Sequence, residues 1–303
     1  MSNVILVKSV SEFIQNIFEL NKIAIDSNSP SVSSINFYRG QSNFEWELEP
    51  KLYRENLLNK ESVLIAEFLR IAPNHFENLT YFDKLVKMQH YGLPTRLLDT
   101  TRNPLVALFF ACYDTNQKKQ DGSVYFFPQL PVLNQNTSFI SLLMKYAFEY
   151  SGISLDIAEF TKDVLNDKKI FSSHTLKYKT TDDVLHTLCK VRYYAVLPTL
   201  NNPRIYNQDG AFLLFGMKIK KITKSTNPGN LNKLYYDFDP IKFNNDLEKF
   251  WKNSKIFRIP ASFKELVLGE LGSIGISRNK MFPELEYQAE FITNMILKEN
   301  NKH

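Results

Sequence analysis

The chain has 303 residues, 44% of them hydrophobic and 23% charged, which is the composition of an ordinary globular protein. Its two cysteines, Cys112 and Cys189, lie far apart in apolar runs. This spacing excludes a disulfide framework and a cysteine-based zinc ribbon, and it favours the reducing cytoplasm. The formal net charge of +5 permits a nucleic-acid or nucleotide partner without arguing for one. No apolar stretch approaches about 18 residues and the N-terminus has no basic region, so we expect no membrane helix and no signal peptide.

Hydrophobic periodicity predicts a mixture of helices and strands without regular βαβ alternation. Apolar residues at helical spacing predict helices at 11–20, 59–71, 82–91, 104–113, 138–150, 155–165, 246–252, 263–271 and 283–297. Short apolar runs beside turn residues predict strands at 35–38, 123–128, 192–197, 211–217 and 256–260. Such a mixture predicts an α+β fold in a single domain, residues 1–303, in which residues from about 130 to 190 form a helical insertion or cap.

The sequence lacks the common signatures of nucleotide hydrolases, metalloproteases and serine hydrolases. It contains no GxxxxGK[ST], HExxH or GxSxG, and the glycine cluster that begins at Gly269 lacks the GxGxxG spacing. The five histidines form no metal-ligand pair at helical spacing, so we expect no metal site. A hydrolase or nuclease built on His90 and Asp99 is the weakest alternative, because no nucleophile accompanies them.

Polar side chains instead stand out where apolar neighbours predict a core. Arg39 ends the strand predicted at 35–38 and is followed by Gly40 and Gln41. A guanidinium at this point binds a carboxylate or phosphate through two hydrogen bonds, and Gly40 lets a ligand approach the backbone. The alternative is an internal salt bridge through which Arg39 pins a loop.

Two further blocks repeat this pattern. Within residues 88–111, seven polar residues lie among aliphatic and aromatic ones: Gln89, His90, Arg96, Asp99, Thr100, Thr101 and Arg102. Buried polar groups need partners, so this density indicates a ligand site, although a residue of 99–101 is alternatively the cap of the following helix. Residues 203–215 place Arg204 and Gln208 beside a strand, where Asp209-Gly210 is also an ordinary turn pair.

At these residues the chain resembles the FRG domain family, which is named for a Phe-Arg-Gly motif. Here the motif reads Phe37-Tyr38-Arg39-Gly40-Gln41. The resemblance continues through WELEPKLYR (46–54), QHYGLPTRLLDTTRNPLVALFFA (89–111), PRIYNQDGAF (203–212), IPASFKELVLGEL (259–271) and MFPELE (281–286). Thr100 departs from the family pattern, in which many members carry Trp at this point.

The order of these motifs also resembles that of ADP-ribosyltransferases. This distant resemblance implies a mixed, split antiparallel sheet core flanked by helices, with NAD or a related nucleotide as substrate and no metal. In those enzymes an Arg on the first core strand holds the dinucleotide, and a hydroxyl segment shapes the nicotinamide side. By this resemblance Arg39, Asp99 and Gln208 are catalytic, and the nucleotide is bound by Tyr38, Gly40, Gln41, Gln89, His90, Arg96, Thr100, Thr101 and Arg204.

The same resemblance leaves the acidic catalytic residue open. Gln208 occupies a position where those enzymes carry Glu or Gln, and an amide supplies no negative charge. Either Asp99 takes that role, or Glu286 reaches in from the C-terminal segment and is also catalytic. Alternatively, Glu284 and Glu286 only favour the dipole of an amphipathic helix in its first turn.

Two functions follow as hypotheses. The first is a cytoplasmic ADP-ribosyltransferase or NAD glycohydrolase that modifies a protein or nucleic-acid acceptor, as a toxin or in bacterial defence against phage. The second is a non-catalytic module in which Arg39, Arg96, Arg102 and Arg204 hold the phosphates of a nucleotide or nucleic acid. The missing Glu and the basic pI of about 8.9 support the second hypothesis. Neither hypothesis involves a membrane partner.

Overall fold

The computed structural model describes residues 4–26, 34–135, 137–151, 154–166, 180–190, 193–227, 229, 233–240, 254–285, 288 and 292–293. Its helices are α1 (Val10–Asp26), α2 (Lys51–Arg54), α3 (Glu61–Ile71), α4 (Tyr81–His90), α5 (Pro104–Cys112), α6 (Ser138–Lys145), α7 (Ile157–Asn166), α9 (Thr181–Lys190), α10 (Pro203–Asn207), α12 (Lys264–Ser273) and α13 (Arg278–Met281). Its strands are β1 (Val4–Leu6), β2 (Ser34–Gln41), β3 (Leu97–Thr101), β4 (Gly122–Asn134), β5 (Leu155–Asp156), β6 (Tyr193–Leu197), β7 (Gly210–Phe215), β8 (Met217–Lys224), β9 (Leu234–Pro240) and β10 (Lys255–Ile259). None of the described helices is long and apolar enough to cross a membrane.

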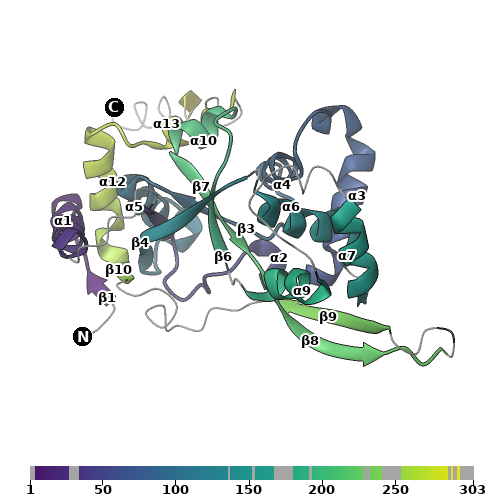
Figure 1. Ribbon diagram of the computed structural model, residues 1–303. Coiled ribbons are helices and arrows are strands. Elements are labelled where there is room, and N and C mark those ends of the chain that lie inside the picture. Colours follow the sequence, from purple (N-terminus) through teal and green to yellow (C-terminus); the bar gives the residue numbers. More distant parts are fainter. Residues whose placement is uncertain are drawn as a thin grey trace.

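A seven-stranded sheet with the order β1-β10-β4-β2-β3-β7-β6 forms the centre of the molecule (Figure 1). The long strand β4 pairs with β2 and then, through Val132–Asn134, with β6, so that β4, β2, β3, β7 and β6 close into a ring. The β1–β10 and β4–β6 pairings are parallel and the other pairings are antiparallel. The fold is therefore mixed α/β with a mixed sheet, and the prediction of an antiparallel core holds for most pairings but not for these two.

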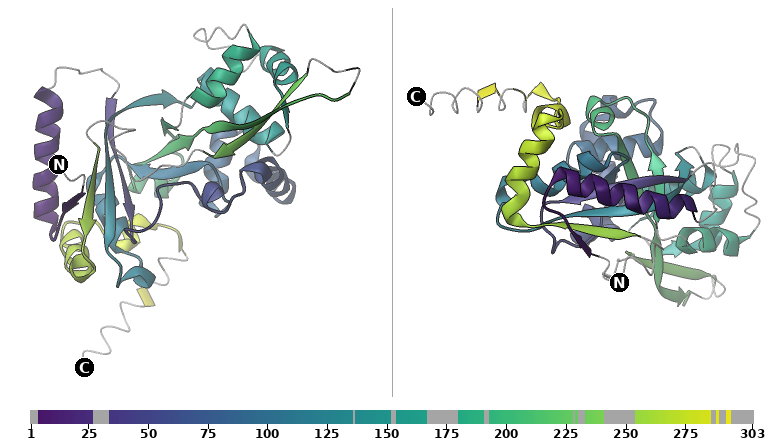
Figure 2. Two further views of the ribbon diagram at one scale, coloured as in Figure 1. Left: turned by 90° about the horizontal axis from the view of Figure 1, so that it is seen from below. Right: turned by 90° about the vertical axis from the view of Figure 1, so that its left-hand side faces the viewer.

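Helices α1, α5 and α12 pack with the β10–β4–β2 part of the sheet (Figure 2). Phe13 of α1 meets Phe257 of β10 edge to face, with ring centroids 4.9 Å apart, and both side chains are fully buried. Ser9 caps the start of α1, since its hydroxyl accepts a hydrogen bond from the Glu12 amide. A second core is formed by helices α3, α4, α6, α7 and α9, which pack with β3, β6 and β7.

Two strands approach α5 so closely that glycine is required at the contacts. A Cβ atom on Gly40 of β2 would lie 1.9 Å from the carbonyl oxygen of Ala107, and one on Gly122 of β4 would lie 2.2 Å from that of Ala111. The backbone of α5 thus requires glycine at residue 40 whether or not a ligand is present, and a role of Gly40 in ligand approach stays a prediction. The resulting close packing fixes the position of Arg39, the residue that precedes Gly40, relative to α5.

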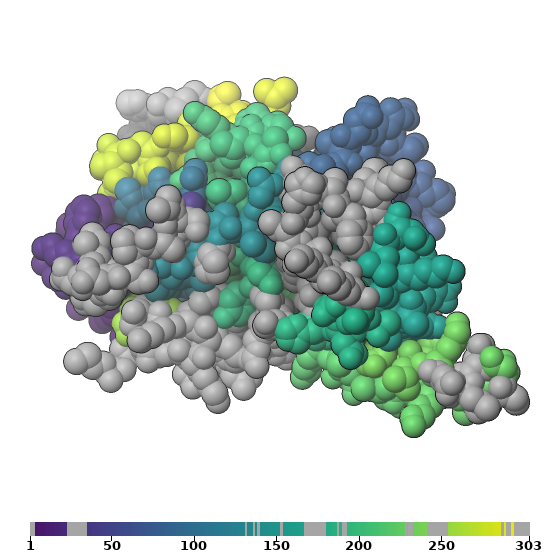
Figure 3. Space-filling view, viewed as in Figure 1, coloured from purple at the N-terminus to yellow at the C-terminus, as the bar shows by residue number. Residues whose placement is uncertain are grey.

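Strands β8 and β9 form a hairpin that, with β5, makes a separate three-stranded sheet. This hairpin projects from the body of the molecule at the lower right of Figures 1 and 3, where β8 is the edge strand. The sequence predicted neither the hairpin beyond residue 217 nor β1. The predicted insertion or cap at about 130–190 corresponds to the end of β4, α6, α7 and α9 in the described residues, and its status as a separate unit stays a prediction.

Most predicted helices and strands are present, with three differences that matter for the site. Residues 99–101, considered as a helix cap, belong to strand β3, and the Asn103 side chain caps α5 by accepting from the Leu105 amide. The segment 203–207, predicted as a loop, is helix α10, which the Asn202 side chain caps. The helix predicted at 246–252 and most of that at 283–297 lie outside the described residues.

Candidate functional site

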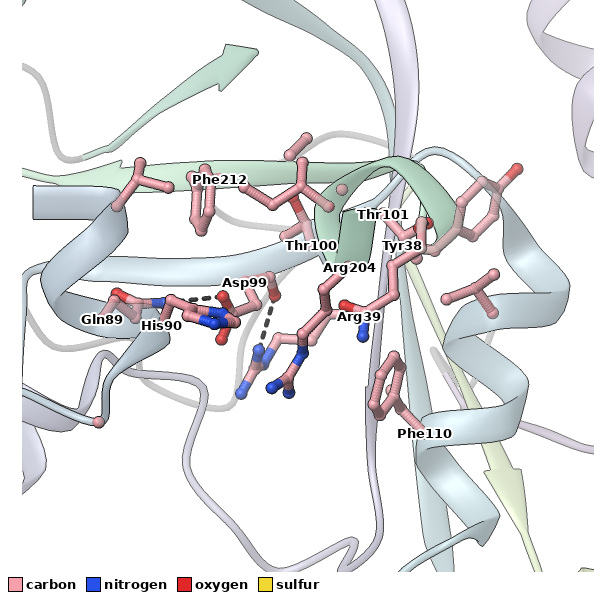
Figure 4. Close-up of a pocket in the computed structure, with 18 residues that line it drawn as sticks. Tyr38, Arg39, Gln89, His90, Asp99, Thr100, Thr101, Phe110, Arg204 and Phe212 are labelled. Atoms are coloured by element: carbon pink, nitrogen blue, oxygen red, sulfur yellow. Dashed lines mark hydrogen bonds between the residues drawn. The ribbon is translucent and has the colours of Figure 1, made fainter. Parts of the chain in front are cut away.

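A cavity of about 430 Å³ opens where β2, β3, β7, α4, α5 and α10 meet (Figure 4). Three chain segments far apart in sequence contribute to it, and they are the three polar blocks that the sequence singled out. Its lining residues are Tyr38, Arg39, Gly40, Val86, Gln89, His90, Gly92, Asp99, Thr100, Thr101, Val106, Phe110, Arg204, Ile205, Gln208, Gly210, Ala211 and Phe212. The volume lies within the range of about 300–1,000 Å³ that is usual for small-molecule sites.

Arg39 reaches into the cavity from β2. Its Nη1 donates a hydrogen bond to the main-chain oxygen of Asp99 at 2.6 Å, while its buried Nε has no hydrogen-bond partner. Burial lowers the pKa of the Arg39 guanidinium, the Asp99 charge opposes this shift, and the Arg54 charge adds to it. An arginine remains protonated at neutral pH even so. Arg39 therefore brings a positive charge to the wall of the cavity.

Asp99 is held by a short chain of polar side chains. Gln89, in the last turn of α4, donates from Nε2 to Asp99 Oδ1 at 2.7 Å, and Thr95 Oγ1 donates to Gln89 Oε1. The orientation of the Gln89 amide is fixed by these two bonds, and the amide in turn fixes the Asp99 carboxylate. Asp99 is exposed to solvent inside the cavity, so its second carboxylate oxygen is accessible to a ligand hydroxyl.

The hydroxyl residues after Asp99 differ in their roles. Thr101 Oγ1 donates to the main-chain oxygen of Gln208 at 2.6 Å and accepts from the Asn103 amide, so it links β3 to α10 and to the start of α5. Thr100 Oγ1 is buried and has no hydrogen-bond partner. The Gln208 side chain lines the cavity while its Nε2 donates to the main-chain oxygen of Met281 at 2.9 Å.

The rim near α10 carries an arginine, a histidine and one acid. Arg204 lies over the ring of Phe282, 4.8 Å from its centroid, and its Nη1 is 3.8 Å from Glu284 Oε1. The same oxygen is 3.9 Å from His90 Nε2. Burial lowers the pKa of His90 below its ordinary value of 6.5, the Arg204 charge acts in the same direction, and Glu284 opposes them. His90 is therefore neutral at pH 7.

Aromatic rings cover the remaining cavity wall. Phe212 of β7 is paired with Asp99 across the strands, and Phe110 projects from α5. Tyr38 of β2 is paired with Thr101, and burial raises the pKa of Tyr38 to about 12, against an opposing hydrogen bond from Asn36. The Tyr38 hydroxyl is thus protonated at neutral pH. Such rings provide flat apolar surface for a base or a pyridine ring.

Two predicted site residues lie outside the cavity, and a third is not among the described residues. Arg96 is fully buried outside the cavity, where its Nε donates to Glu61 Oε1 at 2.8 Å and its guanidinium lies 5.8 Å from the ring centroid of Tyr146. Its assignment as a nucleotide-binding residue is therefore wrong for this structure. Gln41 is buried and donates weakly, at 3.4 Å, to the main-chain oxygen of Glu47. Glu286 lies outside the described residues.

Sequence reasoning missed two contributors to the site. Glu284 was considered mainly as a helix-dipole residue, yet it lies within 4 Å of two cavity-lining side chains. Phe110 was read only as part of an apolar helix.

The described residues offer no metal centre. Among them, no group of three or more His, Cys, Asp or Glu side chains is close enough to hold an ion. The charged groups around the cavity are arginines and single carboxylates, which bind anions and hydroxyl groups through hydrogen bonds.

Together, these observations define a mixed α/β domain with one cavity built from guanidinium, carboxylate and aromatic groups. A family model for the FRG domain matches residues 34–120. The match spans β2, α4, β3 and α5 and so includes Arg39, Gln89 and Asp99, whereas Arg204 and Gln208 lie beyond it. No curated protein and no solved structure matches the chain.

Proposed function

We propose that this protein is an NAD-consuming enzyme of the ADP-ribosyltransferase type, with the cavity as its dinucleotide site. The observation that carries the proposal is the meeting of Arg39, Asp99 and Gln208 in one cavity, although Asp99 lies 60 residues after Arg39 and Gln208 lies 109 residues after Asp99. These are the three positions at which the motif order resembles that of ADP-ribosyltransferases. The likeness of the sheet to the split sheet of those enzymes is part of the same proposal.

The charges and shapes of the cavity support a dinucleotide. Arg39 places a guanidinium charge in the cavity wall, which suits a diphosphate oxygen, because charge-assisted hydrogen bonds to phosphate are the strong ones. Phe110 and Phe212 offer flat apolar surface to the nicotinamide or adenine ring. Two free cysteines fit the reducing cytoplasm, where NAD is abundant.

Asp99 is the acid that we assign to the reaction. When the bond between C1′ and the nicotinamide nitrogen breaks, the electron pair leaves with nicotinamide and positive charge develops on the ribose. A fixed carboxylate stabilises that charge without reorganising, and the hydrogen bond from Gln89 fixes the Asp99 carboxylate. Water or an acceptor side chain or base then forms the new bond to C1′ and loses its proton.

Titration calorimetry with NAD and mass spectrometry of the products test this proposal. Arg39→Ala should weaken NAD binding about tenfold to a hundredfold, because a hydrogen bond to a charged group contributes about 1.5–3 kcal/mol. Asp99→Asn should keep NAD binding and lower nicotinamide release by about a hundredfold or more. Arg70→Ala is the matched control, since Arg70 is an exposed arginine of α3 paired with Glu67.

The outcomes separate the hypotheses. Absence of NAD binding to the parent protein would refute the proposal outright. Binding without release of nicotinamide or transfer of ADP-ribose to lysate protein or nucleic acid would refute catalysis and leave a nucleotide-binding module. Activity in the parent that survives Asp99→Asn would remove Asp99 from the reaction. A role as a toxin or in defence against phage depends on the same activity and is tested by growth of cells that express the parent or the Asp99→Asn variant.

A further inference from the structure

A second cavity, of about 190 Å³, adjoins the main cavity that Arg39 and Asp99 line. The two cavities share three lining residues, and neither is closed off from solvent, so one ligand can lie across the shared residues. The volume is below the range of about 300–1,000 Å³ that is usual for a whole small molecule, so the second cavity suits one part of a ligand. Its lining residues are Leu79, Asp83, Lys87, Tyr91, Thr199, Asn201 and Asn202, together with the shared Val86, His90 and Ile205.

The charges that line the second cavity offset each other. Asp83 and Lys87 have opposite signs, and both also hold parts of the protein. Asp83 Oδ2 accepts from Thr80 Oγ1 at 2.7 Å, and Lys87 Nζ donates to the main-chain oxygen of His75 at 2.6 Å. His90 is neutral at pH 7 because burial lowers its pKa. Such a lining suits an uncharged group better than a phosphate.

Two side chains of the second cavity are available to a ligand. The Tyr91 ring is 58% exposed and meets the His90 ring edge to face, with centroids 5.3 Å apart. The Asn201 side chain is exposed and has no hydrogen-bond partner within the described part of the chain. An exposed aromatic ring is a surface on which a base stacks. An asparagine amide presents one donor and one acceptor, the pattern that matches N7 and the N6 amino group of adenine.

The groups of the main cavity place the reactive half of a dinucleotide. Phe212 is the cross-strand partner of Asp99, so the two side chains lie on the same face of the sheet. A nicotinamide ring that packs on Phe212 therefore has its ribose beside Asp99. Arg39 and Arg204 line the same cavity and supply positive charge for the diphosphate (Figure 4).

The second cavity begins beside the second of these arginines. Arg204 Nη1 and His90 Nε2 both lie within 4 Å of the same Glu284 oxygen, so the arginine and the histidine are close to each other. Ile205 follows Arg204 in α10 and, like His90, lines both cavities. A chain of groups that runs from nicotinamide through ribose and diphosphate thus reaches the second cavity with its remaining half.

We propose that the second cavity is the adenine subsite of the dinucleotide, in which the Tyr91 ring packs on the base and the Asn201 amide pairs with its N6–N7 edge. The inference rests on the proposed function, because the dinucleotide is the ligand that spans the two cavities. Nicotinamide then takes the aromatic wall of the main cavity, beside Asp99.

Titration calorimetry with parts of the dinucleotide tests which half occupies the second cavity. Tyr91→Ala should weaken the binding of NAD and of ADP-ribose about tenfold each, because it removes the ring on which the base stacks. It should leave the binding of nicotinamide mononucleotide unchanged. Tyr91→Phe keeps the ring and should bind all three compounds like the parent. Phe18→Ala removes an exposed aromatic ring of α1 that lines neither cavity, and it is the control.

A dinucleotide with a changed base tests Asn201 independently. Nicotinamide hypoxanthine dinucleotide carries an oxygen in place of the N6 amino group, so its edge presents two acceptors and pairs with only one end of an amide. We expect the parent to prefer NAD over this analogue about tenfold, and Asn201→Ala to lose most of that preference. Asn116→Ala, at an exposed asparagine that lines neither cavity, is the control.

Circular dichroism shows whether each variant is folded. Unchanged affinity of Tyr91→Ala for NAD and ADP-ribose, or a loss confined to nicotinamide mononucleotide, would overturn the inference and leave the proposed function standing. Loss of ADP-ribose transfer in Tyr91→Ala with NAD affinity unchanged would also overturn it, because the second cavity would then hold the acceptor. Binding of ADP-ribose that depends on Tyr91, in a parent protein that releases no nicotinamide, would support the adenine subsite and refute catalysis. Failure of the parent to bind NAD or ADP-ribose would remove the proposed function, and the inference with it.

Discussion

Replacement of Glu61 by Gln leaves the Arg96 guanidinium buried without its counter-charge. The two side chains are 1% and 0% exposed, and Glu61 accepts two hydrogen bonds from Arg96, at Nε and Nη2. Removal of one partner of such a buried pair destabilises a protein by about 3–5 kcal/mol, since the remaining charge has lost both water and its partner. We expect this loss for Glu61→Gln, for Glu61→Met and for Arg96→Met.

The expected change in melting temperature follows from the size of the chain. At about 2.1 cal/mol/K per residue, 303 residues unfold with an entropy of about 0.6 kcal/mol/K near the midpoint. A loss of about 3–5 kcal/mol therefore lowers Tm by about 5–8 °C. The double variant Glu61→Met/Arg96→Met should be more stable than either single variant, because it leaves no buried charge unpaired.

Calorimetric unfolding measures Tm, and NAD titration is carried out well below it. Equal Tm values for Arg96→Met and the parent would refute the structural role of Arg96. Losses of stability that simply add in the double variant would refute the coupling of the two side chains. Loss of ligand binding in a stable, folded Arg96→Met protein would show that Arg96 contributes to ligand binding, which would contradict its position outside the cavity.

Two further predictions concern the sheet that supports the cavity. Gly40→Ala should lower the free energy of unfolding by several kcal/mol, because its Cβ would lie 1.9 Å from the Ala107 carbonyl oxygen. Gly269→Ala is the control: it lies in open space within α12 and should raise the free energy of unfolding by up to about 1 kcal/mol. Denaturant unfolding measures both, and an unchanged stability of Gly40→Ala would contradict the close contact. Burial alone would raise the pKa of Asp121, but hydrogen bonds from a main-chain amide and from Arg258 lower it overall. A carboxylate with a lowered folded-state pKa stabilises the protein above its unfolded pKa of about 4 and loses that effect as the pH falls through the folded value. At pH 7, Asp121→Asn should therefore lower the free energy of unfolding by about 1 kcal/mol, after allowance for solvent screening. At pH 2 the variant and the parent should be equally stable. A difference in stability that persists at pH 2 would contradict the assignment.

Sequence patterns were sufficient for many elements because those elements depend on local periodicity. The apolar spacing in residues 104–113 predicted α5, and the polar residues embedded in apolar blocks pointed to the cavity. The hairpin β8–β9 was missed because the apolar–polar alternation of β8 extends only over residues 217–220 and breaks at the irregularity between Ile219 and Lys221. Helix α10 is only five residues long, which is too short for a periodic signal.

The sequence by itself determined that an arginine, an acid and several amides and hydroxyls occur in apolar surroundings, because residue type and neighbours are local properties. Only the tertiary structure decided which of them share a cavity. Arg39 and Arg96 look alike in the sequence, yet one faces the cavity with an unpartnered Nε and the other is enclosed with Glu61. Their difference depends on contacts across 60 and 35 residues of chain, and the partner of a buried charge is set by such long-range packing.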